Sequence, residues 1–431
     1  MSRSSAFRSH RLATRFCWPL TLALAVLWSG CSSSDSGPAT TDAGNPISSG
    51  ADAPPASTPI AGDPIEPGTG DVGNPGPLGP RIADVGIEVG THPGMEGALF
   101  SADDFPQREI ITVLAPDAIP AITDPVMLDK DQVGYVSDND LVFGVVIDGD
   151  ARAYPHNIGW WHEIVNDVVG GRPLCITFCP LTGTGLVFDG TDIDGNRLEL
   201  GVSGLLYNTN LVMYNRNSPR SLYPQVFSTA VAGDRLGHTL DLMPVVETTW
   251  HAWKQMYPQT KVMAKGTYSS SRYSQYPYGD YRENDANMLF PLRPTLSTNP
   301  NGQTQAYGIK DRVLGLRVDG DAIAFPFDEM DHQQIINTTV GGLEVAIAWD
   351  SSTRMAIPFA RRAGEQSLTF KIVNKGFPFS MRDRETGTLW DIRGLAVEGE
   401  LAGERLIQIP AHNAMWFAWV TFWPNTEVWA P

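Results

Sequence analysis

The sequence predicts an α+β fold that is predominantly antiparallel β and consists of two pseudo-equivalent lobes from an internal duplication. Three observations support this fold class. Short segments of alternating apolar and polar residues, bounded by Gly and Asp turns, recur along the chain. Two long parts of the chain repeat each other. Helical periodicity is confined to a few short segments.

The internal repeat is the strongest of these observations. Four pairs of segments match in the same order along the chain: 143–155 with 314–326, 162–171 with 333–342, 230–244 with 396–410, and 250–262 with 416–428. The first two pairs share one spacing, and the last two share a slightly shorter one. This order and extent predict a duplicated unit, with copies near 140–263 and 311–429.

The beginning of the chain has the features of an export signal followed by a tether. A basic head precedes an apolar run that ends in "LWSGC". This ending resembles a bacterial lipobox, so we expect residues 1–31 to be a signal peptide and Cys31 to carry a lipid. Cleavage by an ordinary signal peptidase and retention as an anchor are the alternatives. Residues 32–80 contain no aromatic residue and consist mainly of small and polar residues, which predicts a disordered tether.

These features predict an exported protein anchored to the bacterial cell envelope, facing the periplasm or the cell surface. The membrane is then a partner through the lipid on Cys31. A formal charge of −17 argues against nucleic acid as a partner. The sequence identifies no protein or small-molecule partner. After the tether we expect a first lobe over 81–263, a connecting segment over 264–310 and a second lobe over 311–431.

Each copy is predicted to contain mostly strands and one helix. "DLVFGVVID" and "ARAYP" form a predicted hairpin with its turn at Gly149-Asp150. Near the end of each copy, aromatic residues recur at helical spacing and a proline follows: Trp250, Trp253, Tyr257 and Pro258, then Trp416, Trp419, Trp423 and Pro424. We expect these aromatic residues to face the core.

Comparison of the two copies distinguishes positions that are expected to be structural from positions that could carry out chemistry. Shared positions are expected to be turn glycines and backbone-bonding polar groups: Asn166, Gly170, Gly171, Asn337, Gly341 and Gly342. Other positions are reactive in the first copy and inert in the second: His162, Glu163, Cys175 and Cys179 fall on Gln333, Gln334, Ala346 and Asp350. This difference predicts one lobe with a site and one structural lobe. Drift in a surface hairpin is the alternative.

Strand geometry predicts which of these residues meet. If Gly170-Gly171 is a two-residue turn, His162 lies directly opposite Cys179 and Asn166 lies opposite Cys175. A four-residue loop would make His162 and Cys179 diagonal neighbours instead. Cys175 and Cys179 are too far apart on one strand for a disulfide, unless the strand ends before Cys179. We expect Cys175 to be a buried small residue and Cys179 to be the functional thiol.

Three functions are compatible with these residues. The first is a binding or accessory module of the cell envelope with a Cys/His site in the first lobe. The second is a soft-metal protein that holds copper or zinc with Cys179 and His162. Met213 or Glu163 would then be a further ligand. The third is a thiol-dependent enzyme with Cys179 as the nucleophile and His162 as the base, where Glu163 or Asn166 orients the base.

The segment that connects the copies is rich in tyrosine. Its tyrosines are Tyr268, Tyr273, Tyr276, Tyr278 and Tyr281. Tyrosines in such a segment either cover the edge of a core or stack on a ligand. We expect the first role, and contact with a ligand is the alternative.

Several motifs of the chain occur together in one known family. They are "ARAYP", "WWHEIVND", "TFCPLTGTGLVFDG", "LYNTNLVMYNR" and the "AVAG…LGHTLDLMP" block. In these motifs the chain resembles, over about residues 80–431, the DUF3179 family of exported bacterial and archaeal proteins. The resemblance implies no established activity. Many relatives have a second cysteine at the position of Thr182, which would suggest a dithiol or a soft-metal site, whereas Thr182 leaves Cys179 alone. The acidic position of the family's "MYDR" segment is Asn215 here and Asp383 in the second copy.

Overall fold

The computed structural model describes residues 102–289 and 307–431, which belong to one compact unit. These two described ranges are called the first half and the second half below. The predicted signal peptide, the predicted lipid site at Cys31 and the predicted tether lie outside the described residues.

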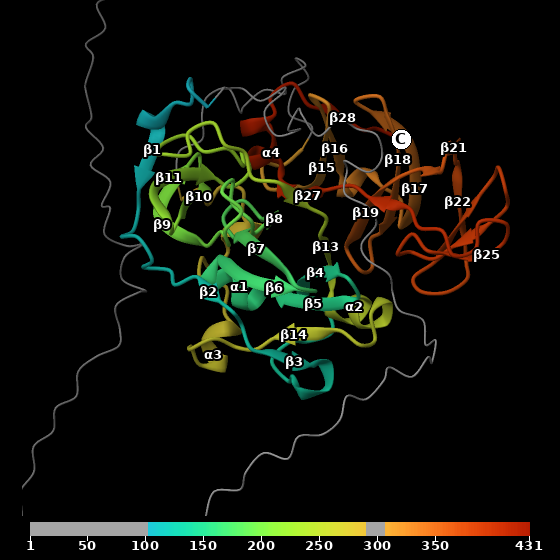
Figure 1. Ribbon diagram of the computed structural model, residues 1–431, viewed down its shortest axis with the longest axis horizontal. Helices are drawn as coiled ribbons and strands as arrows, with labels where there is room; N and C mark the ends of the chain where they lie inside the picture. Colours follow the sequence, from blue (N-terminus) through green and yellow to red (C-terminus); the bar gives the residue numbers. More distant parts are fainter. Residues whose placement is uncertain (1–101, 290–306) are drawn as a thin grey trace, which may run out of the picture. The chain divides into compact units, whose positions relative to one another are not determined.

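The described chain is rich in β-strands that pair mostly antiparallel, as predicted (Figure 1). The first half forms three sheets, ordered β1-β9-β10-β11, β12-β8-β7-β6-β2 and β13-β4-β5-β14-β3. Their strands are β1 (Ile110–Thr112), β2 (Ile122–Thr123), β3 (Met127–Asp129), β4 (Leu141–Ile147), β5 (Asp150–Pro155), β6 (Ile164–Val169), β7 (Arg172–Cys179), β8 (Thr184–Asp189), β9 (Leu200–Tyr207), β10 (Asn210–Asn215), β11 (Ser218–Pro224), β12 (Leu242–Met243), β13 (Val246–Thr249) and β14 (Lys261–Met263).

The second half contains four further sheets, ordered β27-β15-β16-β28, β17-β18-β19-β26, β20-β21 and β22-β23-β24-β25. Their strands are β15 (Arg312–Val318), β16 (Asp321–Pro326), β17 (Gln333–Val340), β18 (Leu343–Asp350), β19 (Met355–Ala360), β20 (Arg362–Ala363), β21 (Gln366–Ser367), β22 (Phe370–Val373), β23 (Ser380–Asp383), β24 (Leu389–Trp390), β25 (Ala396–Glu398), β26 (Ile407–Gln408), β27 (Ala411–Met415) and β28 (Glu427–Val428).

Helices are short throughout the described residues. The α-helices are α1 (His156–His162), α2 (Trp250–Met256), α3 (Ser270–Tyr273) and α4 (Trp416–Phe422). The 3₁₀ helices are η2 (Gln107–Glu109), η3 (Lys130–Gln132), η4 (Tyr281–Glu283) and η6 (Phe327–Glu329). In this part of the chain, no helix has the length and apolar character needed to cross a membrane.

Two-residue turns set the register of the main hairpins. Gly170 and Gly171 have φ of 54° and 81°, values that suit the tight turn between β6 and β7. The predicted register is therefore confirmed at Asn166, which lies opposite Cys175. The turn between β4 and β5 lies one residue earlier than predicted, at Asp148-Gly149, because both of these residues have positive φ.

The same pairings recur in the two halves. β5 pairs antiparallel with β4 and parallel with β14, and β16 does the same with β15 and β28. The helices α2 and α4 form at the two predicted aromatic segments. In each helix a central tryptophan donates a hydrogen bond of 2.8 Å to a threonine hydroxyl, from Trp253 to Thr260 and from Trp419 to Thr426. Both tryptophans face the core, as predicted.

Each of these helices packs into a core built largely by the other half. Helix α4 of the second half contributes Trp416 and Trp419 to a core formed with strands β7 to β11. Helix α2 of the first half contributes Trp250 and Trp253 to a core formed with strands β18, β19 and β22 to β25. The two largest aromatic cores therefore join the two halves. Close approach of the helices is possible because a Cβ at Gly144 or Gly315 would overlap Trp253 or Trp419 respectively.

Candidate functional site

The hairpin of β6 and β7 carries the predicted site residues, but its first strand is shorter than predicted. His162 is the last residue of α1, and β6 begins only at Ile164. The helix ends at Glu163, whose φ of 55° turns the chain and whose N–H bonds to the Gly159 carbonyl. Gly159 also lets α1 lie close to Phe178 of β7, because a Cβ there would contact the Phe178 ring. The expectation that His162 lies on the strand opposite Cys179 was therefore wrong.

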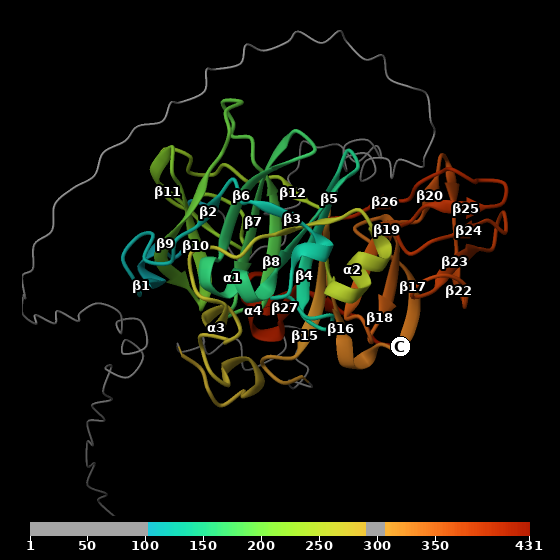
Figure 2. The same cartoon turned by 90° about the horizontal axis from the view of Figure 1, so that it is seen from below.

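Helix α1 lies beside α3 (Figure 2), and His162 at the end of α1 contacts the segment that contains α3. Its Nδ1 lies 2.7 Å from the Pro120 carbonyl oxygen, and its Nε2 lies 2.7 Å from the hydroxyl of Tyr273. The ring also stacks on Tyr268. Burial lowers the pKa of His162, so the ring is neutral at pH 7. Within the described part of the chain, no interaction joins His162 to Cys179, so the structure does not bring together the predicted base and nucleophile.

Cys175 is a buried thiol with a structural environment. It is a free cysteine, and its Sγ lies 3.3 Å from the Asn166 Oδ1 and 3.6 Å from the Leu198 carbonyl oxygen. Asn166 also bonds the backbone of Leu200, accepting from its N–H at 2.9 Å and donating to its carbonyl at 3.0 Å. Burial raises the pKa of Cys175 to about 12. Such a thiol is unreactive at neutral pH.

Asn337 occupies the same role in the second half. It accepts from the Phe370 N–H at 2.8 Å and donates to the Phe370 carbonyl at 2.9 Å. Both asparagines thus attach a neighbouring segment to the middle of a hairpin strand.

Cys179 is the last residue of β7 and the first residue of a tight turn. The Thr182 N–H bonds to the Cys179 carbonyl at 3.3 Å, and the Cys179 thiol donates to the Thr209 carbonyl at 3.7 Å. Burial raises the pKa of Cys179 to about 11, and the nearby Glu163 adds to this rise. The Thr182 hydroxyl and the N–H groups of Leu211 and Thr182 act in the opposite direction. The turn therefore directs donors at a sulfur that would carry negative charge as a thiolate.

Glu163 is the second group of the site. Its side chain is buried, and no hydrogen bond or ion pair satisfies its carboxyl among the described residues. Burial alone raises the pKa of Glu163 to about 8. Its backbone φ of 55° and ψ of −34° are rarely adopted by residues other than glycine. A strained backbone and an unsatisfied acid in one residue are typical of functional sites.

Tyrosines from the connecting segment surround this pair. The Tyr276 hydroxyl donates to the Pro180 carbonyl at 3.0 Å, which fixes it beside the turn of Cys179. Burial raises the pKa of Tyr278 and Tyr281, and nearby Cys179 adds to both effects. Tyr276 and Tyr278 are themselves partly exposed, so the site lies close beneath the surface.

Two hydroxyls near Cys179 have no hydrogen-bond partner in the described structure. They are the Oγ1 of Thr209 and the hydroxyl of Tyr281, and both side chains are fully buried. Unsatisfied buried hydroxyls are rare in native proteins and require an explanation. Together with Cys179 and Glu163 they define what we call the thiol–carboxyl site.

A buried polar network supports the turn from below. Its members are Thr177, Thr182, Thr184, Asn210 and Gln225, which hydrogen-bond to one another. All five are fully buried. A satisfied buried network of this kind holds its members in one arrangement. It therefore fixes the hydroxyl that faces the Cys179 sulfur.

The corresponding turn of the second half begins at Asp350. Its carboxylate accepts hydrogen bonds from the N–H and hydroxyl of Thr353. Gln333 and Ser352 donate two further bonds, at 2.9 and 2.7 Å. Burial acts to raise the pKa of Asp350, but these bonds outweigh it and the pKa is lowered. Thr353 falls on Thr182 in the repeat, so both turns present the same two donors to the residue that begins them.

The predicted metal ligands are not gathered into one cluster. Met213 and Cys179 belong to the same buried core, whereas both ring nitrogens of His162 are engaged elsewhere. Within residues 102–289 and 307–431, no group of three or more His, Cys, Asp or Glu side chains is arranged to hold a metal ion.

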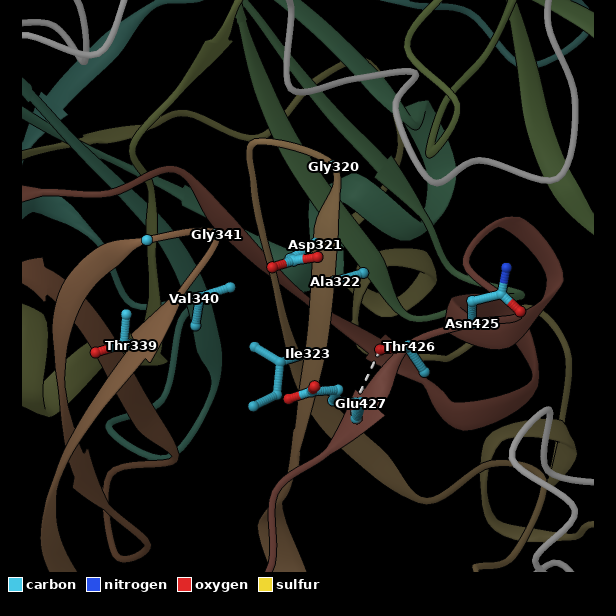
Figure 3. A pocket seen from close by; sticks show the side chains of 11 residues that line it. Gly320, Asp321, Ala322, Ile323, Thr339, Val340, Gly341, Asn425, Thr426 and Glu427 are labelled. Atoms are coloured by element: carbon cyan, nitrogen blue, oxygen red, sulfur yellow. Dashed lines mark hydrogen bonds between the residues drawn. The ribbon is translucent and has the colours of Figure 1, made fainter.

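The second half has a cavity of about 430 Å³ that the sequence did not suggest (Figure 3). Asp321 and Glu427 line it from the neighbouring strands β16 and β28, beside Ile323 and Thr339. In the first half, Arg152 stands at the position of Ile323.

The Arg152 guanidinium fills the corresponding place with ion pairs. It bonds to Asp150 at 2.7 Å and to both carboxylate oxygens of Asp167 at 2.8 and 2.9 Å. Tyr154 donates a further bond of 2.7 Å to Asp167. The cavity of Figure 3 therefore lies where the second half lacks a guanidinium.

Some residues of the thiol–carboxyl site were missed at the level of sequence. The connecting tyrosines were noted, but were assigned to the edge of a core. Nothing in the sequence marks Thr209, whose positive φ of 73° appears only in the fold.

Comparison with known proteins places the chain in a family. No curated protein and no solved structure matches it. The family model described as "Protein of unknown function (DUF3179)" matches residues 116–426, a range that includes the thiol–carboxyl site and both matching turns. The chain therefore belongs to the DUF3179 family, as its motifs indicated.

Proposed function

We propose that this protein is a thiol-dependent enzyme of the cell envelope, with Cys179 as the nucleophile and Glu163 as its proton acceptor. The observation that carries the proposal is a buried carboxyl without a partner beside a thiol that faces hydrogen-bond donors. Glu163 takes the role that the sequence suggested for His162, because the nitrogens of that ring are already bonded.

The turn of Asp350 supports an anionic state of Cys179. There, the N–H and hydroxyl of Thr353 help to hold a full negative charge. The N–H and hydroxyl of Thr182, the matching residue, act to lower the pKa of Cys179, so they would stabilise a thiolate when it forms. A stabilised thiolate is the reactive form of cysteine.

The proposed reaction is acyl transfer to water. The Glu163 carboxylate takes the proton of the Cys179 thiol, and the thiolate attacks the carbonyl carbon of the substrate. A carbon–sulfur bond forms, the bond to the leaving group breaks, and the leaving group departs with the proton from Glu163. Water then hydrolyses the thioester, which releases the acid and restores the thiol.

The surroundings of the site favour an uncharged substrate. The free hydrogen-bonding groups are the hydroxyls of Thr209 and Tyr281, and both are neutral at pH 7. A neutral acyl compound would satisfy these hydroxyls without bringing a second charge into a buried site. Only the carboxylate form of Glu163 accepts a proton, so the rate should rise as the pH passes its pKa of about 8.

A labelling experiment tests the proposal, with Cys175 as an internal control. The full protein is treated with iodoacetamide, and modification of each cysteine is measured by peptide mass spectrometry. Cys179 should react faster, because it lies in a turn close beneath the surface, whereas Cys175 lies within a strand with its sulfur bonded to Asn166. Equal labelling of both thiols, and only on unfolding, would contradict the proposal and leave a binding or accessory module.

A second probe tests the role of Glu163. A neutral activated ester should form an acyl adduct on Cys179, and Glu163→Gln should slow this acylation about a hundredfold because the base is lost. The matched control is Asp383→Asn, which removes a buried carboxylate of the second half that lies outside the site. Equal rates in wild type and Glu163→Gln would remove Glu163 from the reaction.

We further propose that the chain contains the internal duplication, with pseudo-equivalent lobes over 81–263 and 311–431. The matched tryptophan–threonine bonds and the matched hairpin pairings support it. The first lobe then carries the site, and the second lobe carries its inert counterpart.

The cellular location is also part of the proposal. Export, a lipid on Cys31 and anchoring to the cell envelope rest on the sequence of residues 1–31. Metabolic labelling with a fatty acid should mark the wild-type protein and leave Cys31→Ser unlabelled. Release of unlabelled wild-type protein into the soluble fraction would contradict this location.

A further inference from the structure

Two residues of the second lobe hold the turn of Cys179 from outside. The Met415 N–H bonds to the Thr182 carbonyl at 2.9 Å. The Arg312 guanidinium donates from one NH group to the Gly183 carbonyl at 2.6 Å. Gly183 has a φ of 61°, and a Cβ there would overlap the guanidinium. Glycine is therefore required at this position if Arg312 is to reach the turn.

Arg312 is itself held by a buried carboxylate. Its other NH group lies 3.0 and 3.3 Å from the two carboxylate oxygens of Glu247 on β13. Glu247 is 9% exposed. Burial raises the pKa of Glu247, and the charge of Arg312 acts against this rise. The ion pair fixes the guanidinium at the turn, since a charged pair out of solvent has few alternative partners.

One of these two contacts has a counterpart in which the first lobe holds the turn of the second lobe, and the other contact has none. The Thr249 N–H of the first lobe bonds to the Thr353 carbonyl at 3.1 Å, as Met415 does to Thr182. The repeat places Leu141 at the position of Arg312 and Arg354 at the position of Gly183. The guanidinium contact thus belongs only to the turn that carries the thiol.

We propose that Arg312 is a positioning residue, through which the second lobe sets the reactivity of Cys179. This inference rests on the proposed function. By fixing the Gly183 carbonyl, Arg312 keeps the turn closed, with the Thr182 N–H bonded to the Cys179 carbonyl and the Thr182 hydroxyl near the sulfur. Without Arg312 the turn relaxes, the donors move away, and the thiol becomes harder to ionise.

The titratable groups that face Cys179 come from other elements. They are Glu163, which lies between α1 and β6, and Tyr276, Tyr278 and Tyr281 of the connecting segment. Arg312 and Glu247 are not among the main electrostatic influences on the thiol. Arg312 therefore acts on the geometry of the turn.

The test measures iodoacetamide labelling of Cys179 as a function of pH in the full protein. Arg312→Gln should shift the profile to higher pH by about one unit, which lowers the rate about tenfold at a fixed pH below the inflection. Arg312→Lys keeps a cation beside Glu247 and a donor for Gly183, so it should restore part of the rate. The thermal melt of each variant shows whether it folds.

The control removes a contact between the lobes that does not touch the turn. Gln408 donates to the Val245 carbonyl at 3.1 Å, and Gln408→Ala should leave the pH profile unchanged. If Arg312→Gln gives the wild-type profile, or if Gln408→Ala shifts it equally, the positioning role is overturned. If wild-type Cys179 labels no faster than Cys175, the proposed function fails and the inference fails with it.

Discussion

The turns that begin at Cys179 and Asp350 differ in what occupies one shared set of donors. At Asp350, the N–H and hydroxyl of a threonine meet a carboxylate whose hydrogen bonds are satisfied. At Cys179, the corresponding groups of Thr182 lie near a thiol. The neighbouring Glu163 has no partner in the described chain. A satisfied anion is inert, whereas an unsatisfied acid beside a thiol can exchange a proton. On the proposed function, the reactivity of the first turn depends on Cys179 and Glu163, which stand where the second half has Asp350 and Gln334.

The cores that join the halves should give the largest effects. Trp253→Ala and Trp419→Ala each remove a fully buried indole and a hydrogen bond to a threonine. Each should lower the free energy of unfolding by about 4 kcal/mol. Because each helix packs into a core of the other half, both variants should still unfold in one transition, measured by urea denaturation with two spectroscopic probes. Separate transitions of the two halves would contradict the shared cores.

Glu163, beside the turn of Cys179, should make the folded protein less stable as the pH rises. Burial raises the pKa of Glu163 to about 8 in the folded state, from its ordinary value of 4.5. The folded protein then binds more protons than the unfolded chain between these values, so stability is complete below pH 4.5 and falls as the pH rises to about 8.

Glu163→Gln should abolish this loss and be more stable than wild type by about 3 kcal/mol above pH 8. Urea denaturation across the pH range measures the difference. Parallel curves for the two proteins would show that Glu163 is solvated or paired.

Asp350, in the matching turn of the second half, should make the folded protein less stable as the pH falls, and this effect should be smaller. The pKa of Asp350 is lowered, so its contribution is present above the unfolded value of 3.8 and is lost as the pH falls through the folded value. Asp350→Asn should cost about 2 kcal/mol at pH 7, because a charged acceptor of several bonds is lost. Cys179→Ser, the matched change in the other turn, should cost about 1 kcal/mol. Equal costs would remove the contrast between the turns.

The smallest effect concerns the cavity of the second half (Figure 3). The double variant Ile323→Arg and Thr338→Asp reproduces the pair formed by Arg152 and Asp167 in the first half. A double-mutant cycle should give a favourable coupling of about 1 kcal/mol between the two changes. A coupling of zero would mean that the two hairpins do not place these positions alike.

The register of the main hairpin and the position of both aromatic helices could be predicted from the sequence. Prediction succeeded at Gly170-Gly171 because two glycines with positive φ make one turn strongly preferred. It failed at His162, where a strand pattern and a short helix are both compatible with the residues. The choice depended on contact of α1 with β7 near Gly159, which is a tertiary effect.

The composition of the site was only partly accessible from the sequence. Comparison of the copies identified Cys179 and Glu163 as positions that change, and the fold brings these two together without His162. Thr209 and Tyr281 reach the site from distant segments, so no local pattern could assign them. Likewise, only the packing of the halves brings Arg312 to Gly183.

The proposed proton transfer from Cys179 to Glu163 depends on the protonation state of Glu163, which can be measured. Infrared difference spectroscopy of the full protein detects the carbonyl band of a protonated carboxyl, and Glu163→Gln identifies it. We expect this band to be present at pH 7, to disappear near pH 8 and to shift in Cys179→Ser but not in Cys175→Ser. A Glu163 that is already ionised at pH 7, or a band that does not respond to Cys179, would contradict the account.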